Sequence, residues 1–189
     1  MDKELIKILK QCLKKDRRAQ FKLYQYCYPF LMSICFRYQK QHEDAEALLN
    51  EGFLKVLLNL SAFDFERDFN AWAAAIMIRT AIDRYRAEKK YNSSTDLENQ
   101  DSTMEREAVN HQNLNQAQEM TATEVKEFIF SLPKDLRMVF NLYEMEGFKH
   151  KEIAKMLDIS ERSSKRHLKK AKSILKNKLA QNAYLKKVI

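Results

Sequence analysis

The sequence predicts an all-helical protein made of two small helical domains. Its 189 residues include only two glycines and two prolines, where average composition would give roughly thirteen and nine. Sheet folds need many tight turns, and those turns use residues that tolerate a positive φ. Hydrophobic side chains instead recur with the 3.6-residue period of helices. Glycine-rich phosphate-binding loops are excluded as well, because Gly52 and Gly147 lie far apart in the chain.

The charge pattern divides the chain into three segments. The net charge is +8 overall. Positive charge is in excess at both ends, whereas acids dominate the middle. After Tyr91 the middle segment has no aromatic residue until Phe128 and is rich in Asn, Gln, Ser and Thr, which is typical of a flexible linker. We therefore expect a helical domain at residues 1–90, a flexible acidic linker at residues 91–123 and a second helical domain at residues 124–189.

Apolar periodicity predicts the helices of the first domain. They are expected at residues 4–14, 21–38, 43–60 and 69–90. Pro29 is expected to break the second helix near Tyr28 and to start a new one, since proline fits best in a first helical turn. Gly52 lies on the apolar side of the third helix and is interpreted as a site of close helix packing. Three cysteines fall on apolar stripes and are expected in the core: Cys12, Cys27 and Cys35.

The second domain is predicted to end in a helix-turn-helix. A short helix precedes Pro133, which starts another, and Gly147 suits the exit of that helix with a positive φ. Helices at residues 149–157 and 161–179 follow, with Ser160 as the N-cap of the last one. In such motifs the second helix enters the DNA major groove. Residues 161–178 contain eight Lys and Arg against one acid. Six residues of this helix are candidate DNA contacts: Arg162, Ser163, Lys165, Arg166, Lys169 and Lys170.

Three segments of the sequence are informative when they are taken together. The first is the acidic, apolar helix at residues 44–56. The second runs from Phe69 through Trp72 to Arg86, and the third runs from Leu132 through the helix-turn-helix to Leu168. In this order and spacing, they resemble the extracytoplasmic-function sigma factors, a bacterial group within the sigma-70 family. The chain departs from the family pattern at a few positions. We expect these departures to affect which promoter sequence is recognised more than they affect the fold. These are Asn50 in the first segment, Arg79 in the second, and Asp158 with Ser163 and Ser164 in the third.

The resemblance implies a set of partners. It implies binding to core RNA polymerase, at the β′ coiled coil and the β flap, and to the −10 and −35 elements of promoter DNA, with an anti-sigma factor as a further partner. The docking residues it implies are Asp44, Ala47, Asn50, Glu51 and Leu54. Aromatic and basic side chains can hold unstacked single-stranded bases. The residues expected at the −10 element are Phe63, Phe65, Arg79, Arg84 and Arg86.

The sequence also bears on other classes of function. A helix-turn-helix repressor or activator acting alone is the main alternative, although the sequence shows no obvious dimerisation segment. The four histidines are scattered and form no metal-binding motif, so we expect no catalytic residue, metal or cofactor. No apolar run is long enough to span a bilayer, and no signal peptide is apparent at Met1. We therefore expect a cytoplasmic protein without direct membrane insertion.

Overall fold

The computed structural model describes the backbone of residues 2–95 and 122–188, and the side chains of residues 2–91 and 126–179. Every regular element in these ranges is a helix, as predicted. The chain divides into two compact units, Met1–Ala87 and Glu88–Ile189. Most of the predicted acidic linker, residues 96–121, lies outside the described residues.

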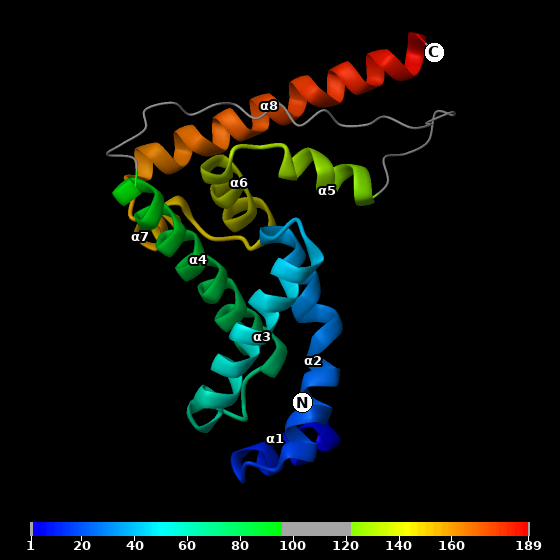
Figure 1. Ribbon diagram of the computed structural model, residues 1–189, viewed down its shortest axis with the longest axis vertical. Coiled ribbons are helices and arrows are strands. Elements are labelled where there is room, and N and C mark those ends of the chain that lie inside the picture. The colour runs from blue at the N-terminus through cyan, green and yellow to red at the C-terminus, as the bar shows by residue number, and fades with distance from the viewer. Residues whose placement is uncertain (1, 96–121, 189) are drawn as a thin grey trace. The chain divides into compact units, whose positions relative to one another are not determined.

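The first unit is built on three long helices and a short one (Figure 1). The helices are α1 (Lys3–Leu13), α2 (Arg17–Tyr38), α3 (His42–Asn59) and α4 (Phe69–Thr95), with a 3₁₀ turn, η1 (Leu60–Ala62), after α3. Each of α1 and α2 begins at an aspartate N-cap, because the carboxylates of Asp2 and Asp16 accept hydrogen bonds from backbone N–H groups of the first turn. The largest fully buried side chains of this unit are Leu9, Leu23, Leu31, Leu48, Leu49, Val56, Leu60, Phe69 and Met77.

The predicted break at Pro29 is wrong, because α2 runs without interruption from Arg17 to Tyr38. A proline inside a helix removes one hydrogen bond and crowds the carbonyl of the preceding turn, which costs about 3 kcal/mol. Pro29 lies on the exposed side of α2, while Cys27 and Leu31 on either side of it are fully buried. Packing of the apolar face therefore outweighs the local cost of the proline.

Gly52 and the cysteines lie as the sequence predicts. A Cβ atom built on Gly52 would fall 2.5 Å from Cε and 2.6 Å from Sδ of Met77, so the glycine allows α3 and α4 to approach closely. The three cysteines are buried and form no disulfide. Burial raises the pKa of Cys12 to about 11 and that of Cys27 and Cys35 to about 12. The thiols are therefore protonated at neutral pH and act as core side chains.

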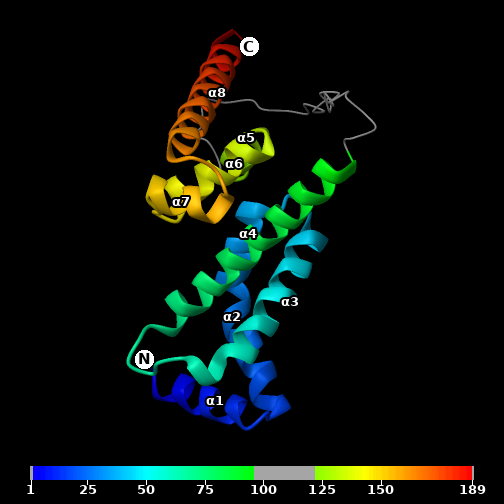
Figure 2. The same cartoon turned by 90° about the vertical axis from the view of Figure 1, so that its left-hand side faces the viewer.

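Residues 122–188 of the second unit form four helices and one π-helical turn (Figure 2). They are α5 (Ala122–Phe130), α6 (Lys134–Phe140), the π turn η2 (Asn141–Met145), α7 (His150–Leu157) and α8 (Glu161–Val188). Pro133 precedes α6 and Gly147 follows η2 with a φ of +75°, as expected. The π turn was not predicted, and α4 and α8 both continue past their predicted ends. The core side chains are Leu132, Leu136, Val139, Leu142, Ile153, Leu157, Leu168 and Ala171.

Candidate nucleic-acid interface

The turn between α7 and α8 is closed without a glycine. Asp158 adopts the left-handed conformation, with φ 53° and ψ 52°, which Asp tolerates better than most residues. The N–H of Ile159 then donates to the carbonyl of Ala154 over 3.0 Å. Ser160 caps α8, since its Oγ accepts the N–H of Ser163 over 3.0 Å. These bonds fix the start of α8, from which the candidate DNA contacts project.

A polar contact joins α7 to α8. Ser164 is fully buried, and its Oγ lies 2.9 Å from Nδ1 of His150. The imidazole also stacks on Tyr143, with ring centroids 4.5 Å apart. Partial burial, and secondarily the charge of Lys165, lower the pKa of His150. Sequence reasoning missed this pair, and its only signal was the unusual Ser163-Ser164 dipeptide.

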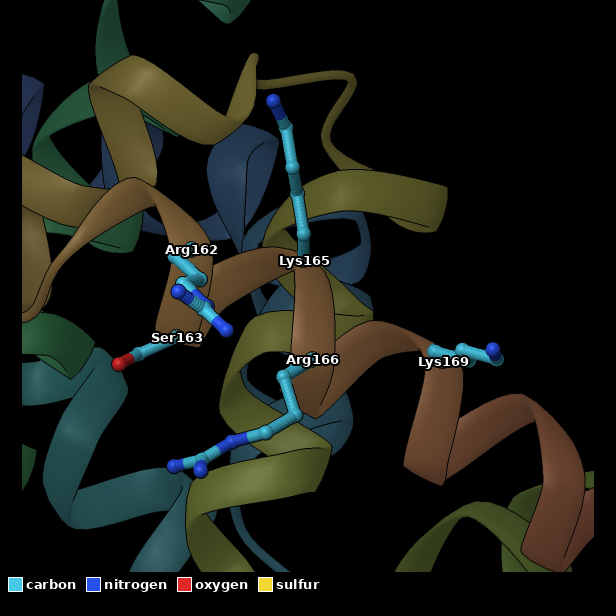
Figure 3. Close-up of a pocket in the computed structure, with 5 residues that line it drawn as sticks. All are labelled: Arg162, Ser163, Lys165, Arg166 and Lys169. Atoms are coloured by element: carbon cyan, nitrogen blue, oxygen red, sulfur yellow. The ribbon is translucent and has the colours of Figure 1, made fainter.

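The N-terminal half of α8 presents an open basic surface. Five of the six predicted residues line a shallow depression of about 340 Å³: Arg162, Ser163, Lys165, Arg166 and Lys169. Figure 3 shows their side chains projecting from successive turns of the helix. The sixth, Lys170, is exposed on the same helix but does not line the depression.

The cations of this surface differ in how they are compensated. Lys165 pairs with Glu161 over 2.7 Å, and Lys172 further along pairs with Glu144 of η2 over 2.7 Å. In contrast, Arg162, Arg166 and Lys169 make no ion pair with any described residue. These three side chains therefore offer uncompensated positive charge, and the two arginines also carry the bidentate donors that can bind phosphate or guanine.

The predicted polymerase-docking residues lie on α3. Asp44, Ala47, Asn50 and Leu54 are all exposed there. Leu54 is 55% exposed, and Leu58, one turn further on, is 71% exposed. Sequence reasoning missed Leu58, although its position four residues after Leu54 places both on one face. Asn50 is held in place, because its Oδ1 accepts a hydrogen bond from the hydroxyl of Tyr24 over 3.2 Å.

Glu51 and Arg84, predicted to bind polymerase and DNA respectively, contact each other in the structure. Nε of Arg84 lies 2.6 Å from Oε2 of Glu51, and its Nη2 donates to the carbonyl of Ala47 over 2.9 Å. Lys55 extends the network, at 3.1 Å from Glu51 and 3.6 Å from Asp83. Burial by itself would raise the pKa of Glu51, but the hydrogen bonds from Arg84 and Lys55 lower it. This network joins α3 to α4.

The aromatic residues before α4 form one cluster. Phe63 is only 5% exposed, and its ring centroid lies 5.4 Å from that of Phe65, 5.4 Å from that of Phe69 and 5.0 Å from that of Trp72. Phe63 thus has no free ring face for a base in this conformation and belongs to the core. Phe65 and Trp72 are half-buried and remain accessible, and Arg79 and Arg86 are exposed on α4.

Within residues 2–95 and 122–188, no group of three or more His, Cys, Asp or Glu is arranged to hold a metal ion. Over the same residues, none of the helices combines the length and the apolar character that a membrane span requires.

Comparison with known proteins gives matches in both units. Residues 23–91 match the family model of Sigma-70 region 2, and residues 123–175 match that of Sigma-70, region 4. The ECF RNA polymerase sigma-E factor of Escherichia coli strain K12 is 28% identical over 146 residues, which cover 72% of this chain and 74% of that protein. Its counterpart in Haemophilus influenzae is 25% identical over 146 residues, which cover 72% of this chain and 75% of that protein.

A solved structure shares the fold. The sigma factor RpoE of Bartonella quintana, determined in complex with the anti-sigma factor NepR, superimposes with a TM-score of 0.51 at 18% identity. The superposition covers 84% of this chain and 95% of that one. The region 2 match includes all of α3 and most of α4, and the region 4 match includes α6, α7 and the first half of α8.

Proposed function

The chain belongs to the extracytoplasmic-function sigma factors, non-enzymatic transcription initiation factors of the sigma-70 family, and we propose that it directs core RNA polymerase to promoters by reading a −35 element through α8 and a −10 element through α4. The observation that carries this proposal is the uncompensated basic surface at the start of a capped helix-turn-helix. The predicted first domain, residues 1–90, then holds the −10 and docking functions, and the predicted second domain, residues 124–189, holds the −35 function.

For the −35 element, Arg162, Arg166 and Lys169 are the central contacts. Their charges face solvent, and none of the three forms an ion pair with an acidic residue that the structure describes. They sit in the N-terminal half of a helix whose counterpart in other helix-turn-helix proteins reaches base edges. Ser163, Lys165 and Lys170 flank them. Lys165 contributes less, because Glu161 already neutralises it.

For the −10 element, we place the contact at the half-buried members of the aromatic cluster and at the basic side of α4. Phe65 and Trp72 offer accessible ring surface for an unstacked base, and Arg79 and Arg86 offer charge for the backbone. Phe63 supports the cluster from the core. Arg84 acts through α3 and not through DNA, because Glu51 and the Ala47 carbonyl occupy its guanidinium.

For polymerase, the docking surface is the exposed face of α3 around Ala47, Asn50 and Leu54, to which we add Leu58. Exposed leucines on one face of a helix, flanked by polar residues such as Asp44, fit a helical protein partner. We propose the β′ coiled coil of core polymerase as that partner, with the β flap contacting the second unit. An anti-sigma factor such as the one bound to the Bartonella protein is a further proposed partner, and the cytoplasm is the proposed location.

Reconstitution tests the proposal. The purified chain is combined with bacterial core polymerase, and run-off transcripts from fragmented genomic DNA of the source species are mapped. We expect a discrete set of start sites preceded by shared −35 and −10 sequences. Failure to bind core polymerase, together with no start site above background, would sink the proposal. A dimer that binds a palindrome tightly without polymerase would instead identify a stand-alone regulator.

A further inference from the structure

The first 22 residues hold the entire positive excess of the first domain. Residues 1–22 contain eight Lys and Arg against three Asp and Glu, whereas residues 23–90 contain nine of each. The match to Sigma-70 region 2 begins at residue 23. The basic excess therefore lies in a segment that neither the family match nor the proposed −10 and docking contacts use.

Helix α1 gathers this charge on one face. Lys3, Lys7, Lys10 and Lys14 follow a spacing of three and four residues, which places them in one stripe, and all four are exposed. The buried side chains of α1, which include Leu5 and Leu9, point the opposite way into the core. Together with Ile6 and Gln11, the four lysines line a shallow depression of about 340 Å³.

The lysines of this stripe are uncompensated. None of the four forms an ion pair with a residue that the structure describes. Like charges four residues apart destabilise a helix by about 0.2–0.5 kcal/mol per pair, and Lys3–Lys7 and Lys10–Lys14 are two such pairs. A helix face that contacts only solvent is more stable when it carries both positive and negative side chains, as α3 does where Lys55 pairs with Glu51. An anionic partner would relieve the repulsion along α1.

The structure favours DNA phosphates over a lipid surface as the partner of this stripe. A helix that lies in a membrane interface needs a free apolar face, but the apolar face of α1 is buried against the rest of the domain. The stripe spans about 16 Å of helix, long enough to face several phosphates of one duplex. α1 also packs against η1, which leads into the aromatic cluster at Phe65, and Figure 2 shows α1 at that end of the unit.

We propose that Lys3, Lys7, Lys10 and Lys14 form a sequence-independent contact between α1 and the DNA backbone. Lysine is a point charge without the fork geometry that reads bases, so this contact adds affinity and not specificity. The contact does not depend on the −10 and −35 assignments, because phosphates are the same at every sequence.

Salt dependence of binding tests this proposal. Binding of the full chain to a fluorescent 30-base-pair duplex of random sequence is followed by anisotropy over a series of salt concentrations. The variant is Lys7→Gln/Lys10→Gln/Lys14→Gln, and the matched control is Lys7→Arg/Lys10→Arg/Lys14→Arg, which keeps the charge. Each phosphate contact contributes about 0.9 to the magnitude of the slope of log K against log salt concentration. We therefore expect the slope of the Gln variant to be smaller in magnitude by about 2–3, and its affinity at low salt to be at least tenfold lower.

The Arg variant, which keeps the positive charge, shows whether charge or structure is responsible for a loss of binding. The Arg variant should keep the wild-type slope, and both variants should keep the wild-type helical spectrum, because the substituted side chains are exposed. A Gln variant with the wild-type slope would overturn the proposal, as would equal losses in the Gln and Arg variants. Loss of binding to anionic phosphatidylglycerol vesicles with unchanged DNA binding would also overturn it and assign the stripe to lipid. Because the duplex carries no promoter, failure here leaves the proposed promoter recognition untouched.

Discussion

Replacement of Arg84 by Met tests whether this residue joins two helices or binds DNA. Arg84 lies 2.6 Å from Glu51 and donates to the carbonyl of Ala47 over 2.9 Å. Methionine keeps a similar apolar stem but removes every donor, so the change isolates the polar contacts. Glu51→Gln removes the negative charge from the other side, and the double variant completes a thermodynamic cycle.

The expected magnitude follows from exposure. The side chains of Arg84 and Glu51 are 28% and 37% exposed, so their ion pair is discounted to about 0.5–1 kcal/mol. The charged hydrogen bond to the Ala47 carbonyl adds about 1.5 kcal/mol. We therefore expect Arg84→Met to lower the free energy of unfolding of the first domain by about 2 kcal/mol. Since the pKa of Glu51 is lowered on folding, its contribution is present above its unfolded pKa and is lost as the pH falls through the folded value.

The fluorescence of Trp72 provides the assay for this loss of stability. It is the only tryptophan in the chain and lies in the first domain, so its fluorescence during urea unfolding reports that domain. We expect a coupling free energy between Arg84→Met and Glu51→Gln of about 0.5–1 kcal/mol. Unchanged stability of Arg84→Met, combined with weaker binding to promoter DNA, would refute the reasoning and restore Arg84 as a DNA contact.

Two further predictions concern other sites. Leu58→Gln should weaken binding to core polymerase about tenfold in a pull-down, since burial of one leucine contributes roughly 1.5 kcal/mol or more. Leu13→Gln, a similar change at an exposed leucine of α1, serves as the control. Equal binding by both variants would argue against this docking face. The pKa of His150, measured by NMR titration and assigned with His150→Gln, should lie below its usual 6.5, so the second domain should lose stability as the pH falls below that value. A pKa at or above 6.5 would contradict the buried contact with Ser164.

The sequence predicted the helices well because their apolar stripes are long and regular. Leu48, Leu49 and Val56 mark α3 from the sequence, and the structure buries all three. Asp158, one of the departures from the family pattern, adopts a positive φ, which Asp tolerates better than most residues. Pro29 was misinterpreted, because a local rule about proline gave no weight to the apolar residues that pack α2 on both sides of it.

The site residues were less predictable, because residue type does not reveal which partner a side chain contacts. Arg84 has the charge of a DNA contact, yet a carboxylate thirty-three residues earlier in the chain binds it. Phe63 has the ring of a base contact, yet three neighbouring rings bury it. In contrast, Arg162 and Arg166 are exposed, because no acidic side chain of α6 or α7 forms an ion pair with them.

The central claim is that α8 directs transcription initiation through its basic surface. The most direct test is promoter-directed transcription with a variant in which this charge is reversed. The variant Arg166→Glu/Lys169→Glu is compared with Lys176→Glu/Lys178→Glu, which makes the same change in charge further along α8, in run-off transcription with core polymerase and in a core-binding pull-down. We predict that the first variant loses initiation at −35-dependent promoters while it binds core polymerase with unchanged affinity, and that the second retains both activities. Wild-type initiation by the first variant, or equal loss of initiation and core binding, would contradict the account.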